Sequence, residues 1–247
     1  MNKLIDYLKL LNITSKEVLT SIQVCINAYN GKHGKVKQVL KSEKLNDING
    51  INVITGYTED GTLCIGFRGT TGDAEWINNF DFYKTDIPFD NIPTDIEVHL
   101  GFIDRYRVVR TWLLDYVGKS GAKKILFTGH SLGATTSTYA CIDIAMNFPF
   151  IEIKNIVFGS PRSGNKPFRE YFNTLIKNSL NFRYRNDIVS RVPPEKLKYK
   201  HIANFVWLAE PTLKDKILHP IRWIKGFAGD HDPVKYLNYL KDNFKKI

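Results

Sequence analysis

The pattern of apolar and polar positions changes its period along the chain, and each period predicts a helix or a strand. Apolar residues recur with helical spacing over about residues 1–30, and an Asn-Gly pair ends this stretch. Two runs with strand character follow at 51–57 and 63–69. The Asp-Gly pair between them predicts a hairpin turn, because both residues tolerate a positive φ.

From residue 101 onward, helical and strand patterns alternate with short connections. The predicted helices cover 101–117, 132–148, 165–179 and 232–246, and the predicted strands cover 123–129, 153–161, 180–186 and 202–208. Such alternation is typical of an α/β fold whose mostly parallel central sheet has helices on both faces. No repeat, low-complexity tract or long linker interrupts the pattern. We therefore expect a single domain over residues 1–247, with an N-terminal helical segment at about 1–30.

Composition narrows the cellular setting. No apolar run approaches the ~18 residues that a membrane span needs, so no transmembrane segment is expected. Asp6 and Lys9 lie inside the first apolar pattern, which is unlike a secretory leader. The cysteines are Cys25, Cys64 and Cys141, an odd number without a CxxC pair, which argues against a disulfide framework and a zinc site. These features predict an intracellular location.

The net charge of +10 raises the question of a nucleic-acid partner. The lysines are scattered over the chain, however, and no zinc-finger, helix-turn-helix or RNA-binding aromatic motif accompanies them. The sequence therefore predicts no nucleic-acid partner. A solvated basic surface is the simpler interpretation, and adsorption to an anionic lipid surface is the alternative, since each nearby basic residue contributes ~1 kcal/mol to such binding.

One short motif indicates chemistry. Residues 129–133 read Gly-His-Ser-Leu-Gly, with a predicted strand before them and a predicted helix after them. A nucleophilic serine held on a sharp strand-to-helix turn needs that context, and it needs small residues where the backbone bends. Ser131 is therefore the candidate nucleophile. The alternative is a serine that only caps the following helix.

A serine hydroxyl needs a base to remove its proton and an acid to orient that base. In hydrolases with this motif the acid and then the histidine follow the serine along the chain. Asp187 follows the strand at 180–186 and is the candidate acid, although an Asn-Asp turn is the simpler interpretation. His231 lies in a loop rich in Gly and Asp before the last helix, which favours it as the base. His219, which precedes a proline, remains the alternative.

The oxyanion that forms during such a reaction needs two hydrogen-bond donors. The backbone N–H of Leu132, directly after the candidate nucleophile, is one candidate. Thr70 follows the strand at 63–69 and offers both its N–H and its hydroxyl. A threonine that merely ends a strand is the alternative.

Several motifs, taken in order, resemble those of the class 3 lipase family, the α/β hydrolases typified by filamentous-fungal triacylglycerol lipases. They are FRGT at 67–70 with Trp76 after it, VHLGF at 98–102, TGHSLGA at 128–134, GSPRSGN at 159–165 and NDIVSRVPP at 186–194. The similarity spans about residues 50–235. It implies an α/β-hydrolase fold and a triad of Ser131, Asp187 and His231, with Thr70 and Leu132 as oxyanion donors.

The resemblance also implies a lid over the acyl site, with Trp76, Ile77 and Phe80 as its apolar edge, and a packing role for His99. It implies a lipid or ester substrate, at an anionic membrane or droplet surface, and neither a metal nor an organic cofactor. Triacylglycerol is the expected substrate, and phospholipase A1 or small-ester esterase activity is the alternative. Acyl transfer and a catalytically inactive binding module are the remaining hypotheses.

Overall fold

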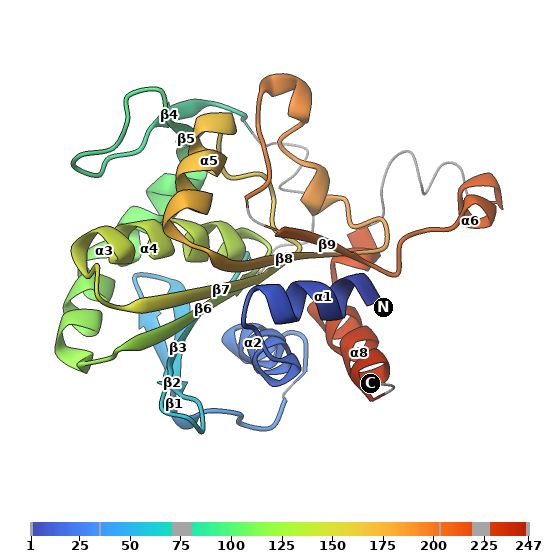
Figure 1. Cartoon of the computed structure of the whole chain (residues 1–247), viewed down its shortest axis with the longest axis horizontal. Coiled ribbons are helices and arrows are strands. Elements are labelled where there is room, and N and C mark those ends of the chain that lie inside the picture. Colours follow the sequence, from blue (N-terminus) through green and yellow to red (C-terminus); the bar gives the residue numbers. More distant parts are fainter. Residues whose placement is uncertain (1, 35, 71–80, 203, 219–227, 246–247) are drawn as a thin grey trace.

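The computed structural model describes residues 2–34, 36–70, 81–202, 204–218 and 228–245. Within them a seven-stranded sheet has the order β1-β2-β3-β6-β7-β8-β9 (Figure 1). Its strands are β1 (Lys41–Ile48), β2 (Ile51–Tyr57), β3 (Leu63–Phe67), β6 (Lys124–His130), β7 (Glu152–Phe158), β8 (Asn178–Tyr184) and β9 (Asn204–Leu208). Strands β3, β6, β7, β8 and β9 run parallel to one another. Strand β2 pairs antiparallel with both β1 and β3. A separate antiparallel pair joins β4 (Lys84–Asp86) to β5 (Glu97–His99).

Helices cover both faces of this sheet. One face carries α3 (Leu100–Ser120), α4 (Leu132–Asn147) and α5 (Lys166–Leu175), and the other carries α1 (Asn2–Leu10), α2 (Ser15–Ala28) and α8 (Pro233–Phe244) (Figure 1). Each face buries its own apolar cluster against the sheet. Short helices complete the fold: η2 (Val189–Arg191), η3 (Glu195–Leu197), α6 (Leu213–Leu218) and η4 (Ala228–His231). The structure confirms the predicted α/β fold with a mostly parallel sheet.

The first strand of the sheet was not predicted from the sequence. β1 pairs with β2 across a turn at Asn49-Gly50, where both residues have positive φ. The Asn-Gly pair was the local signal for this hairpin. β1 lies at the edge of the sheet, and its side chains are exposed or half-buried throughout. An edge strand of this kind carries lysines and no apolar alternation, so its sequence resembles a loop.

Two predicted helices end elsewhere than expected. The N-terminal pattern divides at Asn12, which has φ 48°, and α2 begins with a capping box between Thr14 and Glu17. The helix predicted at 165–179 ends at Leu175, and Asn178 already pairs with β7. Hydrogen bonding to a sheet neighbour far away in sequence overrides the local helical pattern there.

The helices in the described part of the chain are all too short or too polar to cross a lipid bilayer. The three cysteines are buried free thiols on separate elements. Burial raises the pKa of the Cys25 thiol to about 12, which keeps it protonated at neutral pH.

Candidate active site

Ser131 stands at the turn between β6 and α4, with φ 61° and ψ −131°. A positive φ costs a residue other than glycine on the order of 1–3 kcal/mol, and surrounding contacts must hold it in place. One such contact is the hydrogen bond from its amide to the carbonyl of Phe158 at the end of β7, at 3.0 Å. Ser131 occupies the N-cap position of α4, but its side chain makes no capping hydrogen bond. Its hydroxyl therefore does not cap the start of α4.

The two glycines of the motif are required by close backbone approach. A Cβ at Gly129 would lie 2.2 Å from the carbonyl oxygen of Gly133. A Cβ at Gly133 would lie 2.1 Å from the carbonyl oxygen of Phe67, at the end of β3. Neither gap admits a side chain, so glycine at both positions lets α4 start directly against the sheet beneath Ser131.

Asp187 and His231 are joined by a hydrogen bond. Asp187 follows β8 and is fully buried, and its Oδ2 lies 2.8 Å from Nδ1 of His231 in η4. The same oxygen accepts a hydrogen bond from the hydroxyl of Tyr236 on α8 at 2.6 Å. Its other oxygen accepts from the amide of Val189 at 2.8 Å. The buried carboxylate thus has donors on both oxygens, as a buried charge requires.

This bond fixes the state of the histidine ring. A carboxylate only accepts hydrogen bonds, so Nδ1 of His231 carries a proton, and in the neutral ring Nε2 keeps its lone pair. That Nε2 atom is buried and has no hydrogen-bond partner among the described residues. His231 is therefore oriented as a base whose accepting nitrogen is not engaged.

Gly159, at the end of β7, lies against this pair and was not identified from the sequence. It has φ 57°, and a Cβ there would lie 2.9 Å from Oδ2 of Asp187 and 2.9 Å from Nδ1 of His231. A side chain would enter the space that the hydrogen bond occupies. The sequence signal of Gly159 was its place in the GSP stretch that ends a predicted strand.

The loop after β3 approaches the serine. A Cβ at Gly69 would lie 3.0 Å from Cβ of Ser131 and 2.8 Å from the carbonyl oxygen of His130. Thr70 follows it and is half-buried, and Leu132 begins α4 next to Ser131 with 8% of its surface exposed. Leu132 thus lies in the turn that carries the serine, and Thr70 directly follows the glycine that packs against that turn.

Arg105 on α3 holds the same loop and was also missed by sequence reasoning. Its Nη2 donates to the carbonyl oxygen of Arg68 at 2.9 Å and lies 3.5 Å from that of Gly69. Burial and then the charge of Arg68 lower the pKa of Arg105 to about 10. Arg105 remains cationic at neutral pH, and its charge lies behind the loop that carries Thr70.

His130, the residue before Ser131, packs against His231. Its Nδ1 lies 2.9 Å from the hydroxyl of Tyr29, and its ring centroid is 4.4 Å from that of His231. Burial, and then the neighbouring His231 and His33, hold the pKa of His130 well below its usual range. A neutral, fixed ring therefore packs beside the candidate base.

The other predicted residues separate into two groups. His99 is buried with its ring stacked on Phe102, centroids 4.0 Å apart, which agrees with a packing role. Burial lowers its pKa to about 4. The predicted lid residues Trp76, Ile77 and Phe80, and the alternative base His219, lie outside the described residues.

Comparison with known proteins places these features in context. The chain is 29% identical over 174 residues to the secreted mono- and diacylglycerol lipase 1 of Fusarium solani, covering 67% of this chain and 50% of that protein. It is 30% identical over 189 residues to the chloroplastic phospholipase A(1) DAD1 of Arabidopsis thaliana, covering 68% of this chain and 42% of that protein. The chain spans about half the length of the curated relatives that it matches.

These relatives correct one prediction. The sequence led us to expect an intracellular location, whereas the matched mono- and diacylglycerol lipases of Fusarium, Penicillium and Malassezia are secreted proteins. They point to an extracellular location, so the intracellular prediction is wrong. Cysteine usage and the first apolar pattern were too weak a basis for it, because a buried thiol is compatible with either setting.

Two further comparisons concern the fold and the family. A solved triacylglycerol lipase superposes with a TM-score of 0.71 at 20% identity, covering 87% of this chain and 91% of that one, which shows a common fold. The sequence model of the family "Lipase (class 3)" matches residues 64–197, more than half of the 247 residues. That stretch includes the loop after β3, the serine turn and the loop with Asp187. The chain therefore belongs to the class 3 lipase family.

Proposed function

We propose that this chain is a serine hydrolase of carboxylic esters that acts on lipid substrates. The observation that carries the proposal is the buried hydrogen bond between Asp187 and His231, with a serine held at positive φ on the neighbouring turn. Ser131 is the nucleophile, His231 the base and Asp187 the group that orients it. These residues act within one domain that needs neither a metal nor an organic cofactor.

The reaction follows from the protonation state of the ring. His231 Nε2 takes the proton of the Ser131 hydroxyl as its oxygen attacks the ester carbonyl. The N–H groups of Thr70 and Leu132 stabilise the oxyanion, and the positive end of α4 adds to their effect. The imidazolium then gives its proton to the leaving alcohol. A water molecule, activated in the same way, releases the acid from Ser131.

Acylglycerols are the proposed substrate class. The Fusarium relative is a mono- and diacylglycerol lipase, and a triacylglycerol lipase shares the fold. The Arabidopsis relative is a phospholipase A(1), so phospholipids are the second candidate. Hydrolysis of matched acylglycerol and phosphatidylcholine vesicles, with product analysis in the presence of an alcohol, distinguishes these activities and reveals any acyl transfer.

We also propose that α6 brings the enzyme to a lipid surface. This helix projects from the body of the molecule (Figure 1), and Leu213, Ile217 and Leu218 are 74%, 68% and 60% exposed. Lys214 and Lys216 lie on the same turn and a half. Exposed apolar side chains beside lysines are the composition of helices that lie in anionic interfaces.

Vesicle binding tests the role of α6. The double variant Leu213→Ser, Ile217→Ser is expected to bind anionic vesicles about 100-fold more weakly, because it removes two side chains worth ~1.5 kcal/mol each when fully buried. Phe150→Ser is the matched control, since Phe150 is 95% exposed in the turn after α4. Equal binding by the wild type and the α6 variant would contradict the proposed surface.

Active-site labelling tests the proposed triad. A fluorophosphonate probe is expected to label Ser131 in the wild-type protein, as identified by peptide mapping. Labelling is expected to disappear in His231→Ala and to persist in His219→Ala, because His231 is the histidine that bonds Asp187. Absence of any adduct on the folded wild-type protein, with and without detergent, would contradict the hydrolase and favour a binding module.

A further inference from the structure

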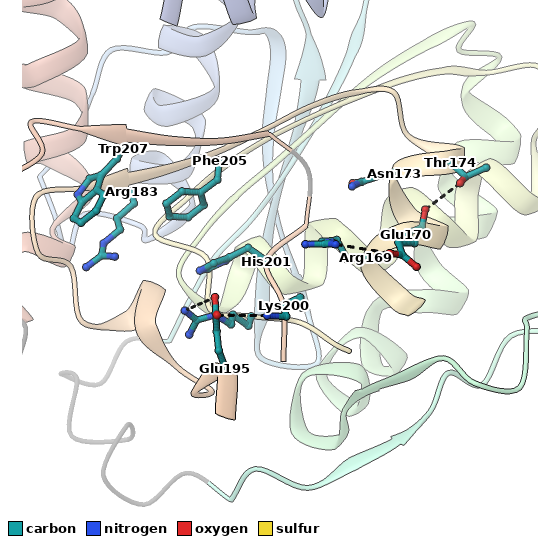
Figure 2. Close-up of a pocket in the computed structure, with 11 residues that line it drawn as sticks. Arg169, Glu170, Asn173, Thr174, Arg183, Glu195, Lys200, His201, Phe205 and Trp207 are labelled. Carbon is teal, nitrogen blue, oxygen red and sulfur yellow. Dashed lines mark hydrogen bonds and ion pairs between the residues drawn. The ribbon is translucent and has the colours of Figure 1, made fainter. Parts of the chain in front are cut away.

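A second cavity lies apart from the serine and is not used by the proposed reaction. It has a volume of about 710 Å³ and lies between α5 and the strands β8 and β9, of which β9 is the edge of the sheet (Figure 2). Its main cationic and aromatic lining residues are Arg162, Arg169, Arg183, Lys200, Phe205 and Trp207. In Figure 2, Arg183 and Trp207 lie at one end and Arg169 at the other, with His201 between them.

The lining carries an excess of positive charge. Four cations face two carboxylates, Glu170 and Glu195, which leaves a net charge of +2 with the histidine neutral. Glu195 is shared, because its two oxygens lie 3.3 Å from Arg162 and 3.4 Å from Lys200. It therefore compensates only one of these two cations. Such an uncompensated group of cations is a favourable place for an anion.

Arg183 has no carboxylate partner among the described residues. Its guanidinium lies over the ring of Trp207, 4.4 Å from the ring centroid, and its Nη2 donates to Oδ1 of Asn186 at 3.1 Å. The remaining donors of the guanidinium are not matched by any acceptor that carries charge. A guanidinium held over an indole ring is oriented in advance, so binding an anion there costs little side-chain entropy.

Like charges lie close enough to oppose one another. Burial lowers the pKa of Arg183, Asp187 partly offsets this, and Arg191 and Arg162 lower it further. Burial also lowers the pKa of Arg162, although Glu195 opposes the effect. Bringing an anion among these guanidinium groups relieves the repulsion between them.

His201 lies in the wall of the cavity and is uncharged at neutral pH. Burial, and then Arg162, lower its pKa to about 3. Its Nε2 lies 2.8 Å from the carbonyl oxygen of Ser190, and Nδ1 lies 3.4 Å from Nδ2 of Asn181. At neutral pH, Nε2 therefore donates to the carbonyl and Nδ1 accepts. The positive charge of the cavity comes from its arginines and lysine.

We propose that this cavity binds a phosphate group, borne by a soluble phosphate ester or by a lipid headgroup, with Arg183 as its principal ligand. A phosphate monoester carries about −1.5 to −2 charges at neutral pH, which matches the excess of +2. A guanidinium fork fits two phosphate oxygens at once. Phe205 and Trp207 offer an apolar wall to the organic part that bears the phosphate.

The cavity is connected to the loop that holds the candidate acid. Arg183 bonds to Asn186, directly before Asp187, and Arg162 Nη1 donates to the carbonyl oxygen of Pro193 at 2.9 Å. His201 holds the same loop at Ser190. A ligand that orders Arg183 and Arg162 therefore stabilises the loop that carries Asp187. Binding is expected to raise the melting temperature of the protein.

Titration with inorganic phosphate at constant ionic strength tests the proposal. Calorimetry is expected to show one saturable site on the wild-type protein, with binding about tenfold weaker in Arg183→Gln. Arg107→Gln is the matched control, because Arg107 is an exposed arginine on α3 that pairs with Asp104. Its affinity is expected to equal that of the wild type. Equal affinity in Arg183→Gln, or equal loss in both variants, would overturn the proposal.

A second variant guards against a folding defect in Arg183→Gln. Lys200→Gln changes a side chain that is 35% exposed and paired only at its tip with Glu195. It is expected to fold like the wild type by circular dichroism and to bind phosphate about threefold more weakly. Unchanged affinity in Lys200→Gln, together with a misfolded Arg183→Gln, would also overturn the proposal.

Two further probes separate the possible sources of the phosphate. Glycerol 3-phosphate represents a soluble ester, and phosphatidylcholine vesicles with phosphatidic acid represent a headgroup, against vesicles of phosphatidylcholine alone. Binding of the soluble ester that depends on Arg183 supports a soluble ligand. Binding only of the phosphatidic acid vesicles, again dependent on Arg183, supports a headgroup. Binding of neither probe overturns the proposal and leaves the proposed hydrolase untouched.

Discussion

The loop at 186–193 has two sides that differ in how their charges are satisfied. On one side the buried carboxylate of Asp187 receives hydrogen bonds from His231, Tyr236 and the amide of Val189. On the other side Arg183 faces an open cavity without a carboxylate partner among the described residues. One short segment thus separates a saturated charge from an unsaturated one.

The surroundings of Asp187, the saturated side, and the cavity at Arg183, the unsaturated side, differ in what they are suited to do. A buried carboxylate with donors on both oxygens is fixed in place, and it orients the ring of His231 before any substrate arrives. A group of cations that lacks counter-charges is incomplete by itself and gains stability when an anion enters. The saturated side is suited to chemistry, and the unsaturated side is suited to binding.

Removing the charge on the saturated side should have the largest effect. Asp187→Asn keeps the shape of the side chain but presents an amide to Nδ1 of His231, which favours the wrong tautomer. Turnover of a soluble ester is expected to fall about 10⁴-fold, as steady-state kinetics will measure. Asp242→Asn, which changes an exposed acid on α8, is the comparison and should keep the turnover of the wild type. A fall of less than tenfold in Asp187→Asn would show that the pair is not the oriented base.

Crowding the saturated side should have the next largest effect. Gly159→Ala places a Cβ 2.9 Å from Asp187 and His231, and displacement of the ring is expected to lower turnover about 10²-fold. Gly121→Ala is the matched control, because Gly121 has φ 63° but nothing within 4 Å. Both variants are expected to lose about 1–2 kcal/mol of stability from the positive φ. Equal activity in the two variants would contradict the crowding.

Removing one donor from the saturated side should have a smaller effect. Tyr236→Phe leaves Oδ2 of Asp187 with His231 alone, and a hydrogen bond to a charged group contributes about 1.5–3 kcal/mol. If half of this acts on the transition state, turnover falls about tenfold. Tyr239→Phe on the same helix removes a hydroxyl that does not bond Asp187, and its kinetics should equal those of the wild type. A larger fall in Tyr239→Phe would refute this assignment.

The smallest expected effect concerns the unsaturated side, where the charge of the cavity is changed. Glu195→Gln removes the carboxylate that Arg162 and Lys200 share, so phosphate affinity is expected to rise about threefold, in the range of exposed ion pairs. Esterase activity should not change. Glu152→Gln removes an acid paired with Lys124 at 3.5 Å, and its phosphate affinity should match the wild type. Weaker phosphate binding in Glu195→Gln would show that charge excess does not control the cavity.

Much of the fold could be predicted from local sequence patterns. The strand and helix periods predicted the parallel sheet and its covering helices because each element buries one apolar face, and burial leaves a regular pattern. The pattern failed at β1, whose edge position leaves its side chains exposed, and at the end of α5, where pairing of Asn178 with β7 overrides the helix. Both failures occur where a neighbour distant in sequence decides the structure.

The candidate site divides in the same way. Ser131 was recognisable because its glycines, strand and helix are contiguous, and the strain at its φ is local. His231 was favoured over His219 only from the composition of its loop. Tyr236 and Arg105 gave no sequence signal of their roles, and Gly159 gave only its place at the end of a predicted strand, since each meets its partner across a separation of dozens of residues.

The sequence alone determined the class of fold and the family, and it supplied the candidate nucleophile and the order of the candidate triad. Only the tertiary structure decided which histidine meets Asp187, which donors saturate that carboxylate and where positive charge is left in excess. The physical reason is that motifs and periodicity record contacts between neighbours along the chain. Hydrogen bonds and charge balance instead depend on the distances between residues that folding brings together from distant parts of the chain.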